Sequence, residues 1–375
     1  MRASGSEAPP AWISTRVTRE LGISYPIIQG PFAGVPTHRL TTLVSNMGGL
    51  GCIGAHGLDG SALSEAIGQV REETSRPFAV NLWVSTSDPG AAQVRPEEIA
   101  KRISCLASYY DELGVTPPVG LHSNIQDFDR QVRAAIDSRV PVLSFTFGIP
   151  PLEVMDECRR LDIPTLGTAT TVEEARALER AGFDLVVASG MEAGGHRGSF
   201  LRSAAHSLTG IFSLIPQVVD SVKVPVIAAG GIADGRAIAA AICLGADAVI
   251  VGTAFLACAE SGASEAYRAA LLSKAAGNTR LTNALTGRMA RAIDNRLVSE
   301  MTVAMESPLP YPIQHALIRT VADAASIEQR AELMPLWAGQ STSLIRSTEA
   351  AELMTSLIRE ADICFRNMGS HSTVA

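Results

Sequence analysis

The 375-residue sequence has few aromatic side chains and no closely spaced pair of cysteines. Phe, Trp and Tyr make up 5% of the residues, against 32 glycines and 20 prolines, which is typical of short loops between tightly packed elements. Without a CxxC pair the common zinc-ligand signatures are excluded, and a chain of this length needs no disulfide framework. We therefore expect reduced, mostly buried thiols in a cytoplasmic protein, at Cys52, Cys105, Cys158, Cys243, Cys258 and Cys364.

The sequence also lacks an excess of positive charge and a clear membrane-spanning run. Lys and Arg number 31 against 38 Asp and Glu, a formal charge of −7, which argues against a general binder of nucleic acid or anionic membranes. Between Arg236 and Glu260 the only charge is Asp247, but Gly245 and Gly252 interrupt this segment, which favours a buried helix followed by a buried strand. The first sixteen residues lack the apolar core of a secretory signal, and 46% hydrophobic residues exclude general disorder.

Short apolar runs alternate with amphipathic helical patterns along most of the chain. Eight runs predict strands buried on both faces, because each is almost continuously apolar. Thr171–Gly182 and Asp234–Gly245 predict helices with a polar N-cap and a terminal glycine. Eight such units predict an α/β fold, a (β/α)₈ TIM barrel; a doubly wound open sheet is disfavoured because an early GxGxxG is missing. The predicted strands are Pro26–Gly30, Leu50–Gly54, Phe78–Leu82, Val140–Phe145, Pro164–Gly167, Leu185–Ser189, Pro225–Ala229 and Ala248–Gly252.

The pattern changes after Phe255, where prolines and helical stretches replace the strand–helix alternation. We predict a barrel over residues 1–257 and a mostly helical cap or lid segment over residues 258–345. Residues 346–375 are predicted to form a C-terminal helix that returns to the barrel, because Leu353, Leu357 and Ile358 fall on one face.

Two glycine-containing loops follow the last two predicted strands. Gly230 and Gly231 come directly after one strand, and Gly252 and Thr253 after the next. Glycine lets backbone N–H groups approach phosphate oxygens, and these two loops of a TIM barrel commonly bind phosphate. The sequence therefore predicts a phosphate site here, with tight turns alone as the alternative.

The loop after the sixth predicted strand, Ser189–Gly198, contains four glycines and a single imidazole, His196. A neutral imidazole at the catalytic face of a barrel can remove a proton next to an electron-withdrawing group. His196 is therefore the candidate base, with a purely structural role as the alternative. The other histidines have no comparable setting and no metal-ligand spacing, so no metal site is predicted; they are His38, His56, His122, His206, His315 and His371.

Several motifs in order resemble the nitronate monooxygenase family, formerly called 2-nitropropane dioxygenases. The resemblance spans about Pro26 to Gln340 and implies an FMN-binding oxidoreductase. Such an enzyme oxidises alkyl nitronates or nitroalkanes with O2 through a flavin semiquinone, giving a carbonyl product and nitrite. The matching segments are Pro26–Gly34, Ser45–Gly51, Asn81–Leu82, Glu192–Gly198 (EAGGHRG), Ala229–Ile232, Gly252–Phe255, Pro308–Ile313 and Leu336–Gln340.

The resemblance also implies a role for each matching residue. Two departures bear on substrate identity: the family usually has Ala-Pro-Met at positions 30–32 and commonly Gln at Ser189. The implied roles are FMN phosphate binding by Gly230, Gly231, Gly252 and Thr253; contact with the flavin ring by Gly30, Pro31, Phe32 and Asn81; lining of the cofactor by Gly194 and Gly195; the base at His196; and the border of the substrate pocket at Tyr311 and Gln340.

Two other functions stay open at this point. An NAD(P)H-dependent FMN enoyl-thioester reductase of the same barrel superfamily shares the early motifs and the glycine loops. A non-enzymatic sensor of a phosphate-bearing ligand would need the loops but not His196 as a base. The partners expected are a small-molecule substrate and O2, with no nucleic acid and no membrane; a homo-oligomer is compatible with the sequence.

Overall fold

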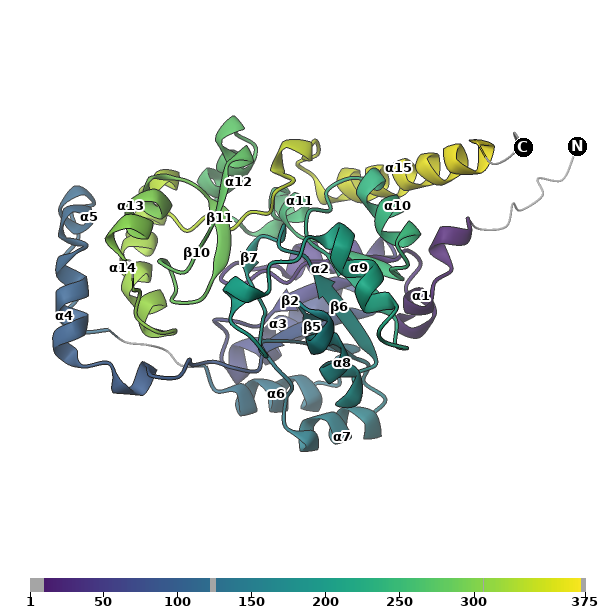
Figure 1. Cartoon of the computed structure of the whole chain (residues 1–375), viewed down its shortest axis with the longest axis horizontal. Coiled ribbons are helices and arrows are strands. Elements are labelled where there is room, and N and C mark those ends of the chain that lie inside the picture. The colour runs from purple at the N-terminus through teal and green to yellow at the C-terminus, as the bar shows by residue number, and fades with distance from the viewer. Residues whose placement is uncertain (1–9, 122–125, 306, 372–375) are drawn as a thin grey trace, which may run out of the picture.

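Eight parallel strands form the centre of the molecule in the computed structural model, which describes residues 10–121, 126–305 and 307–371 (Figure 1). They are hydrogen-bonded in the order β1-β9-β8-β6-β5-β4-β3-β2, and a bridge between Ile28 and Leu50 joins β1 to β2 and closes the barrel. The predicted TIM barrel is confirmed. The strands are β1 (Ile27–Gln29), β2 (Gly51–Gly54), β3 (Phe78–Trp83), β4 (Val142–Thr146), β5 (Thr165–Ala169), β6 (Leu185–Ser189), β8 (Val226–Ala229) and β9 (Ala248–Val251).

The strands are mostly apolar because both of their faces are covered. In β6, Leu185 and Val187 pack inside the barrel, while Val186 and Ala188 pack against the surrounding helices. Parallel strands between two apolar layers need this continuous pattern. The helices around the barrel are α1 (Arg16–Leu21), α2 (His38–Asn46), α3 (Gly60–Glu73), α6 (Phe128–Asp137), α7 (Leu152–Arg160), α8 (Val172–Arg180), α9 (Ile211–Val219), α10 (Gly235–Cys243) and α11 (Thr253–Leu256).

The helix ends follow the signals in the sequence. The Thr171 side chain accepts a hydrogen bond from the backbone N–H of Glu174 and begins α8. Asp234 accepts from the backbone N–H groups of Arg236 and Ala237 and begins α10. Both N-caps are confirmed, and such bonds satisfy donors that the first helical turn leaves unpaired.

The segment after β9 contains more than the predicted helices. It includes α12 (Glu265–Leu271), α13 (Arg296–Ala304) and α14 (Ile313–Ile327), but also the strands β10 (Thr279–Thr282) and β11 (Ala290–Ile293). These two strands form an antiparallel sheet with β7 (Gly195–His196), in the order β10-β11-β7. The loop after β6 is thus hydrogen-bonded directly to the segment that follows the barrel.

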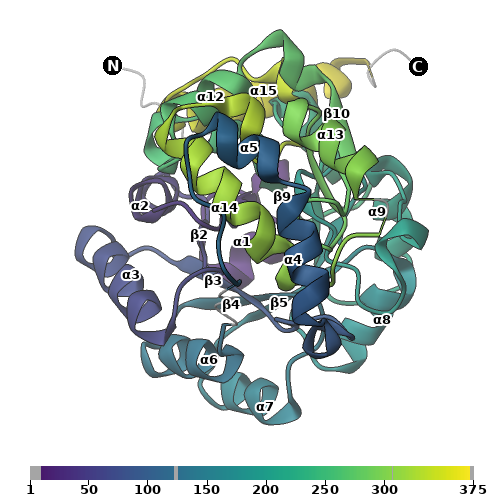
Figure 2. The ribbon, with the colours of Figure 1, turned by 90° about the vertical axis from the view of Figure 1, so that its left-hand side faces the viewer.

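An insertion between β3 and α6 also reaches this segment. It carries α4 (Pro96–Ser104) and α5 (Ala107–Glu112), which lie beside α13 and α14 in both ribbon views (Figures 1 and 2). The Tyr109 hydroxyl donates to the Glu300 carboxylate, 191 residues further along the chain. The hydroxyls of Tyr110 and Thr320 are 2.9 Å apart. The sequence analysis did not predict this arm.

The last helix, α15 (Ala350–His371), packs against α10 and α2. The packing is close: a Cβ added at Gly235 would lie 2.3 Å from the backbone nitrogen of Ala361.

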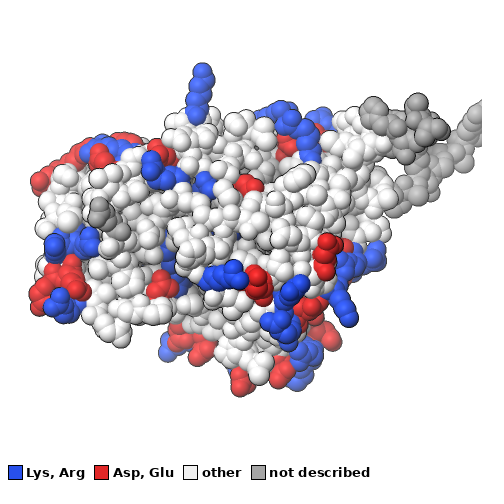
Figure 3. Space-filling view, viewed as in Figure 1, with Lys and Arg blue, Asp and Glu red and all other residues white. Residues whose placement is uncertain are grey.

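All six cysteines are free, and three of them are buried: Cys52, Cys158 and Cys258. The expectation that most are buried was therefore wrong, because Cys105 and Cys243 are exposed and Cys364 is half-buried. None of the helices described here combines the length and the apolar character that crossing a bilayer requires. Lys and Arg lie interspersed with Asp and Glu on the face shown in Figure 3.

Candidate active site

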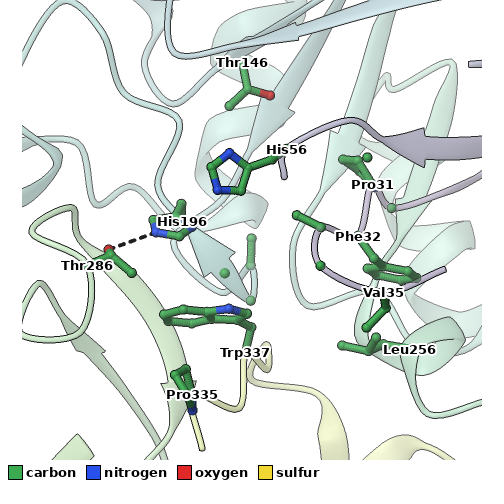
Figure 4. A pocket seen from close by; sticks show the side chains of 18 of the residues that line it. Pro31, Phe32, Val35, His56, Thr146, His196, Leu256, Thr286, Pro335 and Trp337 are labelled. Carbon is green, nitrogen blue, oxygen red and sulfur yellow. Dashed lines mark hydrogen bonds between the residues drawn. The ribbon is translucent and has the colours of Figure 1, made fainter. Parts of the chain in front are cut away.

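A cavity of about 730 Å³ opens at the carboxyl ends of the barrel strands, beneath the segment that follows β9. His196 and Thr286 line one side of it, and Pro31, Phe32 and Leu256 line the other (Figure 4). The side chain of Gln340 is exposed, and its backbone N–H donates to the carbonyl of Glu192. All other residues that the sequence analysis selected line the cavity: Gly30, Pro31, Phe32, Asn81, Gly194, Gly195, His196, Gly230, Gly231, Gly252, Thr253 and Tyr311.

The glycine loops after β8 and β9 form a cradle of free backbone donors. Gly231 has φ +70, a left-handed conformation that favours glycine. The N–H groups of Gly231, Gly252 and Thr253 donate to no acceptor in the part of the chain that the structure describes. A Cβ added at Gly252 would meet nothing within 4 Å, so this side of the loop is open. Unpaired N–H groups around open space suit an anionic phosphate.

The end of the segment after β9 adds one more donor to this cradle. The backbone N–H of Gly339 donates to Oγ1 of Thr253 over 2.9 Å, which leaves the hydroxyl hydrogen of Thr253 free to donate in turn. Gly194 packs so tightly against this segment that an added Cβ would lie 2.5 Å from the nitrogen of Gly339. The cradle thus depends on a contact between residues 86 positions apart in the sequence.

A buried arginine holds the loop after β6 from behind. The Arg197 side chain, 2% exposed, donates to the carbonyl oxygens of Ser189 (2.8 Å) and Ser207 (3.2 Å) and to that of Gly190. Burial lowers the pKa of Arg197 to about 10, a value at which the guanidinium still carries its charge at neutral pH. Nearby, the Glu192 carboxylate accepts from the backbone N–H of Ile211 at the start of α9.

Polar side chains from three neighbouring strands cross the mouth of the barrel. Nδ2 of Asn81 donates to Ser144 Oγ (3.0 Å) and to Thr146 Oγ1 (3.2 Å), and the Thr146 hydroxyl lies 3.4 Å from that of Thr168. Asn81, Thr146 and Thr168 also line the cavity. This row offers hydrogen bonds to the polar edge of a flat ring laid across the strand ends.

The geometry of His196 fixes which ring nitrogen is basic. Its Nε2 lies 2.9 Å from Oγ1 of Thr286, and that hydroxyl donates its own hydrogen to the carbonyl of Arg288. With its hydrogen on that carbonyl, Thr286 accepts from His196, and in this arrangement Nε2 carries the hydrogen and Nδ1 keeps the lone pair. Burial, together with His56, His315 and Arg288, lowers the pKa of His196 well below its usual value. The ring is neutral at physiological pH, as a base requires.

Two further histidines line the same cavity, which corrects the expectation that His196 alone lies in a catalytic setting. Nε2 of His56 lies 3.2 Å from the Tyr311 hydroxyl, and its ring stacks on Trp83 with centroids 3.9 Å apart. The His315 ring is 5.9 Å from those of His56 and Tyr311. Burial is the main cause that lowers the pKa of His56 to about 3 and that of His315 to about 4.

Arg288 ties the cavity wall to the insertion after β3. Its guanidinium lies 4.3 Å from the ring centroids of both Phe147 and Tyr311. Nε donates to the Asp88 carboxylate over 2.9 Å, and Nη1 donates to the carbonyl of Ser85 over 3.0 Å. The charge is thus paired and the aromatic wall is held in place. Among the described residues, no group of three or more His, Cys, Asp or Glu side chains could hold a metal ion.

Comparison with known proteins shows the family of the chain. The family model described as nitronate monooxygenase matches residues 14–360. The chain belongs to the nitronate monooxygenase family. It is 42% identical over 351 residues to a probable nitronate monooxygenase of Staphylococcus haemolyticus, covering 93% of this chain and 97% of that protein.

Two solved structures match this chain over nearly its whole length. A nitroalkane oxidase from Streptomyces ansochromogenes matches with a TM-score of 0.86 and 37% identity, covering 94% of this chain and 99% of that chain. FabK from Thermotoga maritima matches with a TM-score of 0.75 and 29% identity, covering 95% of this chain and 99% of that chain.

The two positions expected to depart from the family's usual sequence, residues 30–32 and Ser189, both lie in the cavity wall. The Phe32 side chain, 9% exposed, packs into the core beside the cavity. Ser189 accepts a long hydrogen bond of 3.4 Å from Nη1 of Arg197, so its short side chain is held back against the loop. This member of the family therefore has an aromatic ring on one side of its cavity and a small hydroxyl at the end of β6.

Proposed function

We propose that this protein is an FMN-dependent monooxygenase that oxidises alkyl nitronates, and nitroalkanes after loss of their α-proton, with O2 to a carbonyl product and nitrite. One observation carries the proposal: a neutral imidazole, His196, faces the same cavity as a cradle of unpaired backbone N–H groups at Gly231, Gly252 and Thr253. The nitronate monooxygenase relatives and the nitroalkane oxidase support a nitro compound as the substrate.

The residues present fit FMN. The phosphate would bind at Gly230, Gly231, Gly252 and Thr253, where donors are free and an added Cβ at Gly252 would project into open space. The flat ring would lie across the strand ends, between the 30–32 segment, Asn81 and the 194–195 segment, all of which line the cavity. Bound FMN would supply the one-electron and oxygen chemistry that no side chain provides.

The protein's own part begins with a proton transfer. With a neutral nitroalkane, Nδ1 of His196 takes the α-proton, and the electron pair of the broken C–H bond passes to the nitro oxygens. Thr286 holds the ring through Nε2, so the lone pair keeps its orientation. A nitronate arrives already ionised; its binding would raise the basicity of His196, and a protonated ring then stabilises the anion.

The setting we propose is a cytoplasmic enzyme of small-molecule metabolism. Six cysteines without a disulfide fit a reducing compartment. The division into a barrel, a cap over residues 258–345 and a returning helix is part of the same proposal, with the α4–α5 arm added to the cap because it packs there.

Anaerobic mixing tests this function. Purified protein is expected to be yellow, and ethyl nitronate is expected to bleach the flavin, with nitrite formed once O2 is admitted. Bleaching by NAD(P)H, without a response to ethyl nitronate, would instead identify the enoyl-thioester reductase. A colourless protein that binds no FMN when FMN is added would exclude both enzymes and leave the sensor.

A further inference from the structure

The hydrogen bond between His56 and Tyr311 has no part in the chemistry so far. His56 follows β2, and its ring is fixed by stacking on Trp83, at 3.9 Å and 20° between the planes. Nε2 lies 3.2 Å from the Tyr311 hydroxyl. The other nitrogen, Nδ1, is buried and has no hydrogen-bond partner in the described chain. Oε1 of its polar neighbour Gln126 accepts from Nε2 of Gln131 and does not meet the geometry of a hydrogen bond with Nδ1.

This arrangement determines where His56 carries its hydrogen. The ring is neutral, because burial, His315 and Arg288 lower the pKa of His56 to about 3. A hydrogen on Nδ1 would be a buried donor without an acceptor, which proteins rarely tolerate. A hydrogen on Nε2 finds the phenol oxygen of Tyr311. With that tautomer Nε2 donates and Tyr311 accepts over 3.2 Å.

The consequence concerns the hydrogen of the Tyr311 hydroxyl. Since His56 offers no lone pair on that side, the O–H bond must point elsewhere, and Tyr311 lines the cavity. Burial raises the pKa of Tyr311 to about 12, so the hydroxyl keeps its hydrogen at physiological pH. A phenol whose oxygen accepts a hydrogen bond is also a stronger donor.

We propose that Tyr311 donates this hydrogen to an oxygen of the nitro or nitronate group, and that His56 is the positioning residue that orients it. The inference rests on the proposed function. Removal of the α-proton moves negative charge onto the nitro oxygens, and a donor already oriented there stabilises that charge as it forms. His196 and Tyr311 then act on opposite ends of one reacting group, the carbon acid and its oxygens.

The other ionisable groups around the pair do not replace this role. The His315 ring is 5.9 Å from both rings and forms no hydrogen bond in the described chain. Arg288 lies over the ring of Tyr311, but its donors are taken by Asp88 and Ser85. The directed donor is thus the Tyr311 hydroxyl.

Two substitutions of His56 separate hydrogen bonding from packing. In His56→Gln the side-chain amide nitrogen reaches the position of Nε2 and can still donate to Tyr311, whereas in His56→Asn it does not. Both lose the stacking on Trp83. We expect His56→Asn to lower kcat/KM for ethyl nitronate and nitroethane about tenfold, the effect of one hydrogen bond to a charged group, and His56→Gln to recover most of it. Flavin content and melting temperature should match between the two.

A double-mutant cycle with Tyr311→Phe assigns the effect to the hydroxyl. Once the hydroxyl is gone, His56→Asn and His56→Gln should have equal activity, because nothing is left to orient. A second measurement needs no turnover: propionate, a planar anion with two oxygens, is titrated into the flavin-bound protein and followed by flavin absorbance. Its Kd should rise about tenfold in His56→Asn and little in His56→Gln. The same pair of substitutions at the exposed His206 is the control.

Two results would overturn the inference: equal effects of the two His56 substitutions while Tyr311 is intact, or a difference that persists in Tyr311→Phe. These outcomes differ from failure of the proposed function. If the unsubstituted protein does not turn over ethyl nitronate at all, the proposed function falls and the inference falls with it.

Discussion

Replacing His196 by Asn separates proton transfer from every other role of this side chain. Asn keeps a polar group but lacks the basic Nδ1 lone pair. The fold should tolerate the change, because Thr286 Oγ1 loses one donor but still accepts from the backbone N–H of Arg288. One neutral hydrogen bond of this kind contributes about 1 kcal/mol to the free energy of unfolding.

The expected loss depends on whether the substrate still carries its α-proton. A positioned general base accelerates a reaction by roughly 10²–10⁴-fold. Turnover of nitroethane by His196→Asn should therefore fall by that factor. Turnover of ethyl nitronate should fall much less, since no proton remains to be removed. Flavin content should be unchanged, because other loops form the cradle.

The assay compares kcat/KM for the two substrates from nitrite release, with melting temperature and flavin absorbance as controls. A pH series adds a further check. Because the pKa of His196 lies well below the usual value of about 6.5, the base stays deprotonated as the pH falls through that value. Nitroethane turnover should therefore decline only in more acidic solution. Equal losses on both substrates, or a decline centred near the ordinary histidine pKa, would refute the assignment of His196 as the base.

Three other substitutions probe the rest of the cavity. Gly231→Val should lose FMN. The control Gly114→Val, at an exposed glycine with a similar φ of +62, carries comparable backbone strain and should keep FMN. Full flavin occupancy in Gly231→Val would contradict the phosphate assignment. Tyr311→Phe should change KM or kcat about tenfold with flavin retained, and a bleached preparation would place the hydroxyl in the cofactor site or the core. Thr286→Val should slow nitroethane turnover about tenfold by releasing the His196 ring; unchanged kinetics would mean that other contacts hold it.

The barrel was predictable because its signals are local. Each strand is mostly apolar on both faces, so the run of residues identifies it. The capping side chains Thr171 and Asp234 lie within one helical turn of the groups they bind. The glycines of the cradle were predictable for the same reason, since each directly follows a strand. Their use by FMN stays a prediction.

Contacts between segments far apart in the chain have no comparable local signal in the sequence. His56 lies 255 residues before its partner Tyr311, and neither residue type nor spacing marks the pair. The helix α4 could have been recognised from Pro96 followed by Glu97 and Glu98, which is typical of a helix N-terminus. Its packing on the segment after the barrel depends on tertiary contacts such as that between Tyr109 and Glu300, which no local pattern predicts.

The contacts of Arg288 have a consequence for how molecules reach the cavity. This side chain joins the wall to Asp88 and Ser85, and the backbone N–H of Asp88 donates to the carbonyl of Tyr311. Lifting the cover as a rigid lid would break all of these bonds at once and leave a guanidinium without its carboxylate. We therefore expect exchange with solvent without such lifting, on the side where the cavity wall includes the half-exposed Arg319 of α14. On that expectation, the size of the opening to solvent, rather than closure around a bound molecule, decides which compounds enter.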